Sequence, residues 1–175
     1  MDRTDTEAGA QPGAAAQQQA ARAAQAAQAA QAARAAWLRV LALAAPDALA
    51  QAVGRLGALP AYRLLRKPES GMAMVRGRAG GTGAQFNLGE VSVTRCAVTL
   101  EPGVVGVGYV QGRTHAQAEQ IAVLDALLQL PDWHARVQAE VVAPLARART
   151  AQGEHKAAVA AQTKVEFFTM VRGED

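Results

Sequence analysis

The spacing of large apolar side chains predicts two helices before residue 60. Trp37, Leu41 and Ala45 recur at helical spacing, so they place one helix face against a core. Pro46-Asp47 then interrupts the pattern. We expect Asp47 to cap a second helix that ends at about Leu56, because Asp is a preferred N-cap residue.

From Pro60 to Gln111 the apolar period changes from that of a helix to that of a strand. Pro and Gly in residues 68–71 and 101–103 predict turns between neighbouring antiparallel strands. The longer link, residues 77–89, contains five glycines. Of all the loops, we expect this one to contact a ligand or a partner. Four strands are predicted, over residues 61–67, 72–78, 90–100 and 104–111.

Helical spacing returns after the strands. Thr114 and Gln117 fit a capping box that opens a helix over residues 115–130. Another helical stretch covers residues 133–162 and should be kinked near Pro144. Residues 165–171 are extended and apolar, so we expect them to join the sheet or a partner.

This order predicts an α+β fold: an antiparallel sheet of about four strands, with helices before and after it that pack mainly on one face. Residues 1–36 contain 17 Ala and 7 Gln, which predicts a low-complexity tail that is a frayed helix or disordered. The single domain is then residues 37–175. That length supports one core and excludes a TIM barrel or a complete dinucleotide-binding enzyme.

Positive charge is concentrated in the predicted sheet. The first 36 residues carry three Arg against three acidic residues, whereas the segment from Arg55 to Arg95 carries seven positive and two negative side chains. Such a surface suits phosphates or an acidic partner. The alternative is that these are ordinary solvated strand edges, where Lys and Arg prevent unwanted pairing.

The single cysteine, Cys96, excludes an intrachain disulfide and a cysteine metal cluster. No His-Glu-x-x-His spacing is present, so we expect no metal site. The chain also lacks a basic signal-peptide start and a run of about 20 strongly apolar residues. We therefore expect a cytoplasmic protein.

The first candidate site is the glycine-rich stretch that follows two arginines. Glycines allow backbone N–H groups to turn toward an anion, and Arg76 and Arg78 lie two residues apart on one strand face. The stretch lacks the Gly-Lys-Ser/Thr ending of a P-loop, and a flexible hairpin connection is the alternative. Its candidate residues are Arg76, Arg78, Gly80, Gly81, Thr82 and Gly83.

The second candidate is the passage from the last strand into the helix at residue 115. A helix N-terminus carries partial positive charge, which Arg113 and His115 would reinforce for a phosphate. Gln111 and Gly112 complete the candidate set, and simple capping by Thr114 is the alternative. No catalytic triad can be built, so catalytic residues stay unassigned and the residues indicate an anion-binding or partner-binding module.

Several separated blocks together resemble one family. Residues 80–90, 93–98 and 106–113, together with the ending at 167–173, are similar to PhnG, the G subunit of bacterial carbon–phosphorus lyase. The similarity extends from about Trp37 to Gly173 in order, and the Ala/Gln tail has no counterpart in it.

The resemblance implies a subunit of a cytoplasmic complex with PhnH-, PhnI- and PhnJ-like subunits, with a PhnL-like protein in the pathway. Together such proteins make alpha-D-ribose 1-methylphosphonate 5-triphosphate, as the phosphonate displaces adenine from C1′ of ATP. ATP is the substrate of the complex, and we expect this chain to bind no cofactor itself. The resemblance implies an accessory, organising subunit that is inactive alone.

We therefore expect Arg76, Arg78, Arg95 and Arg113 to contact an anion or a partner. Phe167, Phe168, Met170 and Arg172 are the expected partner interface. Two other classes compete with this interpretation. A nucleic-acid-binding module would use the basic surface with Tyr62, Tyr109 and Phe86, and a self-sufficient enzyme would turn over substrate without other subunits.

Overall fold

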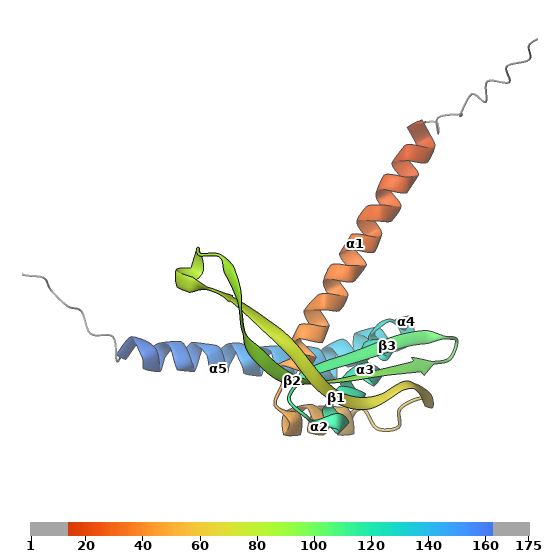
Figure 1. Ribbon diagram of the computed structural model, residues 1–175. Helices are drawn as coiled ribbons and strands as arrows, with labels where there is room; N and C mark the ends of the chain where they lie inside the picture. Colours follow the sequence, from red (N-terminus) through yellow and green to blue (C-terminus); the bar gives the residue numbers. More distant parts are fainter. Residues whose placement is uncertain (1–13, 163–175) are drawn as a thin grey trace, which may run out of the picture. The chain divides into compact units, whose positions relative to one another are not determined.

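A computed structural model describes residues 14–162. The chain forms two compact units, which divide between Trp37 and Leu38 and are treated separately below. The elements, in chain order, are α1 (Ala14–Ala42), α2 (Pro46–Arg55), β1 (Tyr62–Arg78), a 3-10 turn (Ala79–Gly81), β2 (Gln85–Leu100), β3 (Val104–Gln111), α3 (His115–Leu128), α4 (Pro131–Val137), a π-helical turn (Gln138–Val142) and α5 (Ala143–Gln162) (Figure 1).

The first unit is helical over its described residues. Its Ala/Gln repeats lie within α1, as high helix propensity predicts, and the side chains of residues 17–33 are all exposed. In the second unit, α2 begins at Pro46, before the residue that was predicted to cap it. Asp47 is not its cap: Ala45 occupies the N-cap position, and Asp47 lies in the first turn, where its charge faces the positive helix end.

The α+β fold is confirmed, but within residues 14–162 the sheet has three strands and not four. All neighbours are antiparallel, in the order β1-β2-β3. The predicted turn at residues 68–71 is wrong, because β1 continues through it: Ser70 pairs with Thr94 and Gly71 with Val93. Register shifts on either side of Arg66 absorb the extra residues, and an edge strand tolerates Pro and Gly at such bulges.

The predicted loop at residues 77–89 is also shorter than expected. β1 runs to Arg78 and β2 starts at Gln85, so only residues 79–84 connect them. Gly80 and Gly81 have φ angles of 59° and 79°, which favour glycine and explain its presence at this turn.

The β1–β2 hairpin extends beyond the rest of the sheet. β3 pairs only with residues 93–100 of β2, so residues 71–92 continue as a two-stranded ribbon, which we call the arm (Figure 1). A register shift between Val75 and Arg76 leaves Leu88 as an extra residue in β2. The arm therefore consists of two strands and a glycine-rich tip.

The core forms where α3 packs on the inner face of the sheet. Gly106 and Gly108 face the helix, and a Cβ on either would collide with the carbonyl oxygen of Ala122 or Ala118 respectively. Small residues on both sides thus bring helix and sheet backbones close together. Leu124 and Leu127 of α3 are fully buried. The helix α3 thus covers one face of the sheet, as predicted.

Side chains of α3 also cover the outer edge of β3. The Val107 N–H donates to Oδ2 of Asp125 over 2.9 Å, and Nε2 of Gln129 donates to the Val105 carbonyl over 3.0 Å. Asp125 is fully buried, so its contact is shielded from water. These bonds occupy backbone groups that would otherwise be open to another strand.

The helix after the sheet starts at His115, but the predicted capping box is wrong. Thr114 is the N-cap residue without a side-chain cap hydrogen bond. Gln117 is buried, and its Nε2 instead donates to the Ala44 carbonyl over 3.0 Å, so a tertiary contact replaces the local one. The irregularity near Pro144 is confirmed as the π-helical turn before α5, since proline has no N–H to donate to the preceding turn.

Among residues 14–162, no single helix is long and apolar enough to cross a membrane. Only the bent pair Gln17–Ala42 and Pro46–Arg55 passes such a test jointly, which is weak evidence because core helices pass it as well. The predicted extended segment at residues 165–171 lies outside the described residues, as do Phe167, Phe168, Met170 and Arg172.

Candidate functional site

The structure brings two predicted site residues together at the start of α3. Arg113 and His115 line an open hollow of about 470 Å³ with Ser70, Gly71 and Met72 of β1. Nε2 of His115 lies 3.0 Å from Oγ of Ser70. Ser70 was assigned to a turn from the sequence, so it was missed as a candidate. Reading residues 69–72 as an alternating strand would have placed Ser70 and Met72 on one face.

A chain of hydrogen bonds fixes the orientation of this hollow. The fully buried Thr94 donates from Oγ1 to the Gly112 carbonyl over 2.8 Å, and its oxygen lies 2.9 Å from Oγ of Ser70. Since Thr94 has already donated its only hydroxyl proton, Ser70 must donate to Thr94. Ser70 must then accept from His115, which places a proton on Nε2 of that imidazole.

Gly112 makes the turn from β3 into α3. Its φ angle is 96°, in the region that favours glycine, and its N–H donates to the Ser92 carbonyl over 2.8 Å. The prediction that the strand turns on this glycine into a helix start is therefore confirmed. Gln111 is exposed at the end of β3, where it pairs with Val93.

The hollow has the chemistry of an anion site. Arg113 is exposed and presents a guanidinium, and His115 presents an imidazole beside it. The first turn of α3 adds backbone N–H groups with partial positive charge. None of the five described residues that line the hollow is acidic.

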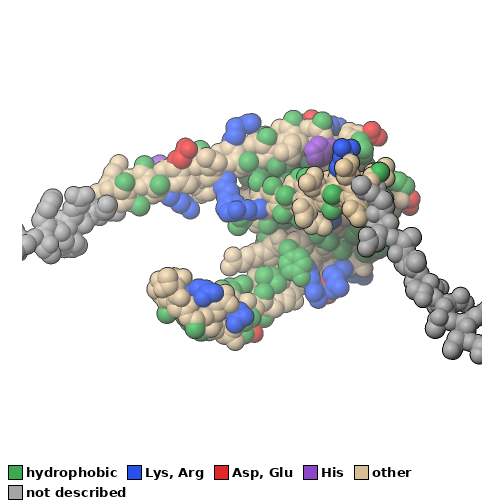
Figure 2. All heavy atoms as spheres, turned by 90° about the horizontal axis from the view of Figure 1, so that it is seen from above, with side chains coloured by type: hydrophobic (Ala, Val, Ile, Leu, Met, Phe, Trp, Pro, Cys, Tyr) green, Lys and Arg blue, Asp and Glu red, His purple; other side chains and the backbone are tan. Residues whose placement is uncertain are grey.

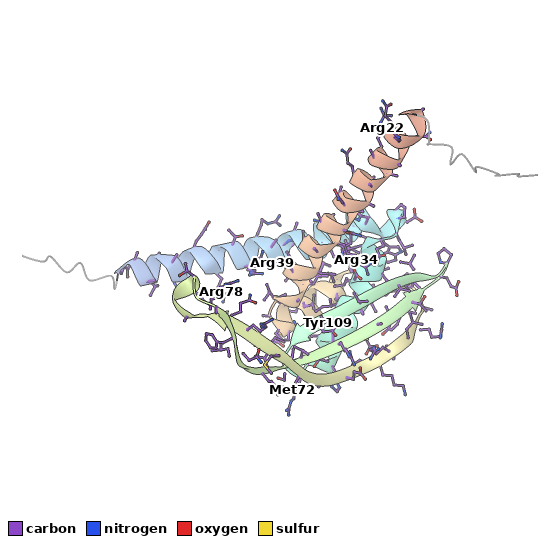
Figure 3. All side chains as sticks on the ribbon, turned by 45° about the horizontal axis from the view of Figure 1, so that its top comes forward. Arg22, Arg34, Arg39, Met72, Arg78 and Tyr109 are labelled. Carbon is purple, nitrogen blue, oxygen red and sulfur yellow. The ribbon has the colours of Figure 1, made fainter. Side chains whose placement is uncertain are left out.

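Arg76 and Arg78 lie apart from this hollow, toward the tip of the arm. They pair with Asn87 and Gln85, so both point to one face of the ribbon, as predicted. Nη1 of Arg78 donates to the Gly83 carbonyl over 2.9 Å, which holds the tip together. Figure 3 shows Arg78 near the tip and Met72 near the base of the arm.

The predicted tip residues form a closed turn. The Gly83 N–H donates to the Ala79 carbonyl over 3.0 Å, and a Cβ on Gly83 would come within 2.9 Å of that oxygen. Gly80, Gly81 and Thr82 are exposed around it. The glycines are therefore explained by the geometry of the turn.

Arg95 lies on the other, outer face of the sheet. It follows the buried Thr94 along β2, and its Nε donates to Oε1 of Glu69 over 2.7 Å. The same carboxylate oxygen lies 2.5 Å from Nη1 of Arg66. A hollow of about 350 Å³ lies beside Arg95 and Glu69, with Tyr109 in its wall.

These contacts shift the pKa values of Glu69 and Arg95. Hydrogen bonds from Arg66 and then Arg95 lower the pKa of Glu69. Hydrogen bonding to Tyr109 and then Glu69 raises the pKa of Arg95. Glu69 thus already pairs with Arg95, and it shares its single negative charge between Arg95 and Arg66. The four predicted arginines consequently occupy three places: the α3 hollow, the arm and the outer face.

Cys96 is a poor nucleophile. Its thiol is buried, Sγ lies 3.4 Å from the Arg66 carbonyl oxygen, and burial is the main cause that raises its pKa. A raised pKa keeps the thiol protonated at neutral pH. Within residues 14–162, no group of three or more His, Cys, Asp or Glu side chains is placed to hold a metal ion.

Fold and site together define a small α+β binding domain, with a basic hollow beside its core and a projecting arm. Residues 32–173 match the family described as phosphonate metabolism protein PhnG, and the chain belongs to this family. It is 43% identical over 141 residues to the "Alpha-D-ribose 1-methylphosphonate 5-triphosphate synthase subunit PhnG" of Rhizobium meliloti (strain 1021). That alignment covers 79% of this chain and 88% of the relative, so the resemblance noted from the sequence motifs is confirmed.

Proposed function

We propose that the chain is the G subunit of a multi-subunit synthase that forms alpha-D-ribose 1-methylphosphonate 5-triphosphate in phosphonate metabolism. The observation that carries this proposal is the family match over residues 32–173, together with the 43% identity to a subunit of that name. In the reaction, methylphosphonate displaces adenine from C1′ of ATP. ATP is then a substrate of the whole complex, and this chain binds no cofactor of its own.

We further propose that its partners are PhnH-, PhnI- and PhnJ-like subunits, with a PhnL-like protein in the pathway, and that the complex works in the cytoplasm. Displacement at C1′ needs a positioned nucleophile and a stabilised leaving base. Among the described residues, no carboxylate lines the α3 hollow beside the hydrogen-bonded Ser70 and His115. This arrangement supports an accessory, organising role for the chain.

Within the complex, the α3 hollow is the place where this chain meets an anion. Arg113 offers charge-assisted hydrogen bonds to the oxygens of a phosphonate or triphosphate, beside the imidazole of His115. Ser70 and Thr94 hold His115 toward the hollow through the hydrogen bonds described above. Arg95 contributes less, because Glu69 already pairs with it.

Co-expression tests the proposal. A tagged copy of the full chain should co-purify with the H-, I- and J-type subunits of the same pathway. Failure of the wild-type chain to assemble with them would sink the proposed function.

The alternative, a nucleic-acid-binding module, rests on exposed aromatic rings on a basic protein. Phe86 is 46% exposed and Tyr109 54% exposed. Such binding would be sequence-tolerant and would weaken steeply with salt. Salt-dependent binding of random single-stranded DNA, combined with failure to assemble, would favour this alternative.

A further inference from the structure

The arm, residues 71–92, exposes large apolar side chains along both of its strands. Met72 is 57% and Met74 52% exposed on β1, and Phe86 is 46% and Leu88 65% exposed on β2. No residue of the arm is buried. Figure 2 shows hydrophobic and basic side chains together on this projection, which stands clear of the body of the second unit. Large apolar side chains exposed on one projection mark an interaction site.

The two faces of the arm differ in chemistry. Phe86 and Leu88 lie on the same face as Gly77, because a Cβ on Gly77 would lie 3.9 Å from atoms of both side chains. Val75 and Ala73 continue this apolar face toward the base. The opposite face carries Met72 and Met74, followed by Arg76 and Arg78 near the tip.

The edges of the arm are also open. Where the sheet is complete, Asp125 of α3 and Gln129, which directly follows α3, occupy backbone groups of the edge strand β3. Residues 85–91 of β2 have no neighbouring strand on the β3 side among the described residues, and β1 is the other edge of the sheet. A two-stranded ribbon of this length is marginally stable in water without a packing surface. The arm therefore has the properties of an element that is stabilised by what it binds.

Charge indicates the kind of surface that the arm fits. The arm carries two arginines, Arg76 and Arg78, toward its tip and one acidic residue, Glu90. The arginine tips of two copies would repel each other. A surface with an apolar groove and carboxylates at its rim would bury Phe86 and Leu88 and pair with Arg76.

We propose that the arm is the docking element of this chain and inserts into an acidic-rimmed apolar groove on another subunit of the synthase. This inference rests on the proposed function, since that function supplies the other subunits. Phe86, Leu88 and Val75 fill the groove, and Arg76 meets its carboxylates. The α3 hollow lies at the base of the arm, because Met72 and Gly71 belong to both.

Substitution of the apolar face tests the proposal in the co-expressed complex. Phe86→Ser with Leu88→Ser should weaken co-purification at least about tenfold, because buried anchor residues dominate interface energies. Val159→Ser is the matched control, because Val159 is 48% exposed on α5 and lies outside the arm. Circular dichroism and the thermal midpoint of each purified chain establish that the variants fold. Undiminished co-purification of a folded double variant would overturn the proposal.

The charge of the groove is tested separately. Arg76→Glu should weaken assembly more than Arg147→Glu, which makes the same charge change on exposed α5. The difference should shrink as salt is raised, because ionic contacts at a rim are screened. Equal effects of the two substitutions would contradict an acidic rim facing the arm.

If something other than a synthase subunit covers the arm, hydrogen exchange and the oligomeric state of the isolated chain will show it. Backbone amides of residues 85–91 should exchange rapidly in the isolated full chain and slowly in the complex. Slow exchange in the isolated chain that is lost on removing residues 163–175 would overturn the proposal in favour of the chain's own terminus. An isolated-chain dimer that Phe86→Ser disperses would overturn it in favour of a second copy. If the wild-type complex assembles and the arm variants assemble equally well, the inference fails while the proposed function stands.

Discussion

Gly108 of β3 lies against the main chain of Ala118 in α3, so closely that a Cβ on Gly108 would overlap the Ala118 carbonyl oxygen and reach within 3.0 Å of the Ala122 nitrogen. The contact is between two backbones, so no side-chain rotation can relieve it. Gly106 meets Ala122 and Ala126 in the same way one turn along the helix. This pair of glycines sets how closely α3 approaches the sheet, and with it the position of the α3 hollow.

Gly108→Val should destabilise the domain by about 3 kcal/mol or more, at the upper end of overpacking costs, because helix and strand must move apart. Chemical denaturation measures the free energy of unfolding. Gly153→Ala is the control of opposite sign: nothing lies within 4 Å of its Cβ position in α5, and Ala favours a helix over Gly by about 1 kcal/mol. A Gly108→Val protein as stable as wild type would contradict the close contact.

Thr94→Val should cost about 1–2 kcal/mol of unfolding free energy. The substitution keeps the shape but leaves the Gly112 carbonyl and the Ser70 hydroxyl without their buried partner. Ser70→Ala is the comparison, and it should cost less because Ser70 is exposed. Denaturation measures the unfolding free energy of both variants, and a larger loss for Ser70→Ala would contradict the buried Thr94 as the main stabilising member of the network.

Tyr62 gives a prediction at alkaline pH. A hydrogen bond from its hydroxyl to Oε1 of Glu119, 2.7 Å long, and then burial raise the pKa of Tyr62 to about 12. Since the folded pKa is above the ordinary value near 10, the stabilisation is complete below pH 10 and is lost as pH rises toward 12. The stability of Tyr62→Phe should therefore lack this alkaline loss.

The phenolate absorbance of wild type minus that of Tyr62→Phe isolates this titration. The difference should have its midpoint near pH 12, and Tyr109→Phe is the control because it leaves the Tyr62 titration in place. A midpoint near 10 would mean that the hydrogen bond to Glu119 is absent in solution.

Arg113→Gln tests the α3 hollow in the assembled complex. Loss of a charge-assisted hydrogen bond to an anion costs about 1.5–3 kcal/mol, which corresponds to roughly a 10- to 150-fold fall in kcat/KM for adenine release. Assembly should be unchanged, because Arg113 lies outside the arm. Arg147→Gln removes the same charge on α5 and should have little effect. A wild-type rate in the complex with Arg113→Gln would contradict anion binding in the α3 hollow.

Much of this fold follows from local sequence patterns. The break at Pro46-Asp47, the helix start at His115 and the turn at Gly112 were all predicted, because proline, glycine and apolar periodicity act within a few residues. Residues 68–71 were assigned wrongly because turn residues also occur at bulges of an edge strand. Only pairing with β2, more than twenty residues away, decides between the two.

The candidate site divides in the same way. The proximity of Arg113 and His115 was readable from the sequence because they are neighbours along the chain. Ser70 joins them only through the sheet, and Arg95 is turned to the other face because strand side chains alternate. Neither placement is encoded in residue spacing, so a basic stretch in the sequence does not become a single basic surface in the fold.

The most direct test of the central claim is methylphosphonate-dependent release of adenine from ATP by the purified subunits, measured with and without this chain. The account predicts release by the full set, and none by this chain alone or by the set that lacks it. Undiminished release without this chain, or turnover by this chain alone, would contradict the claim that it is a non-catalytic but required subunit of the synthase.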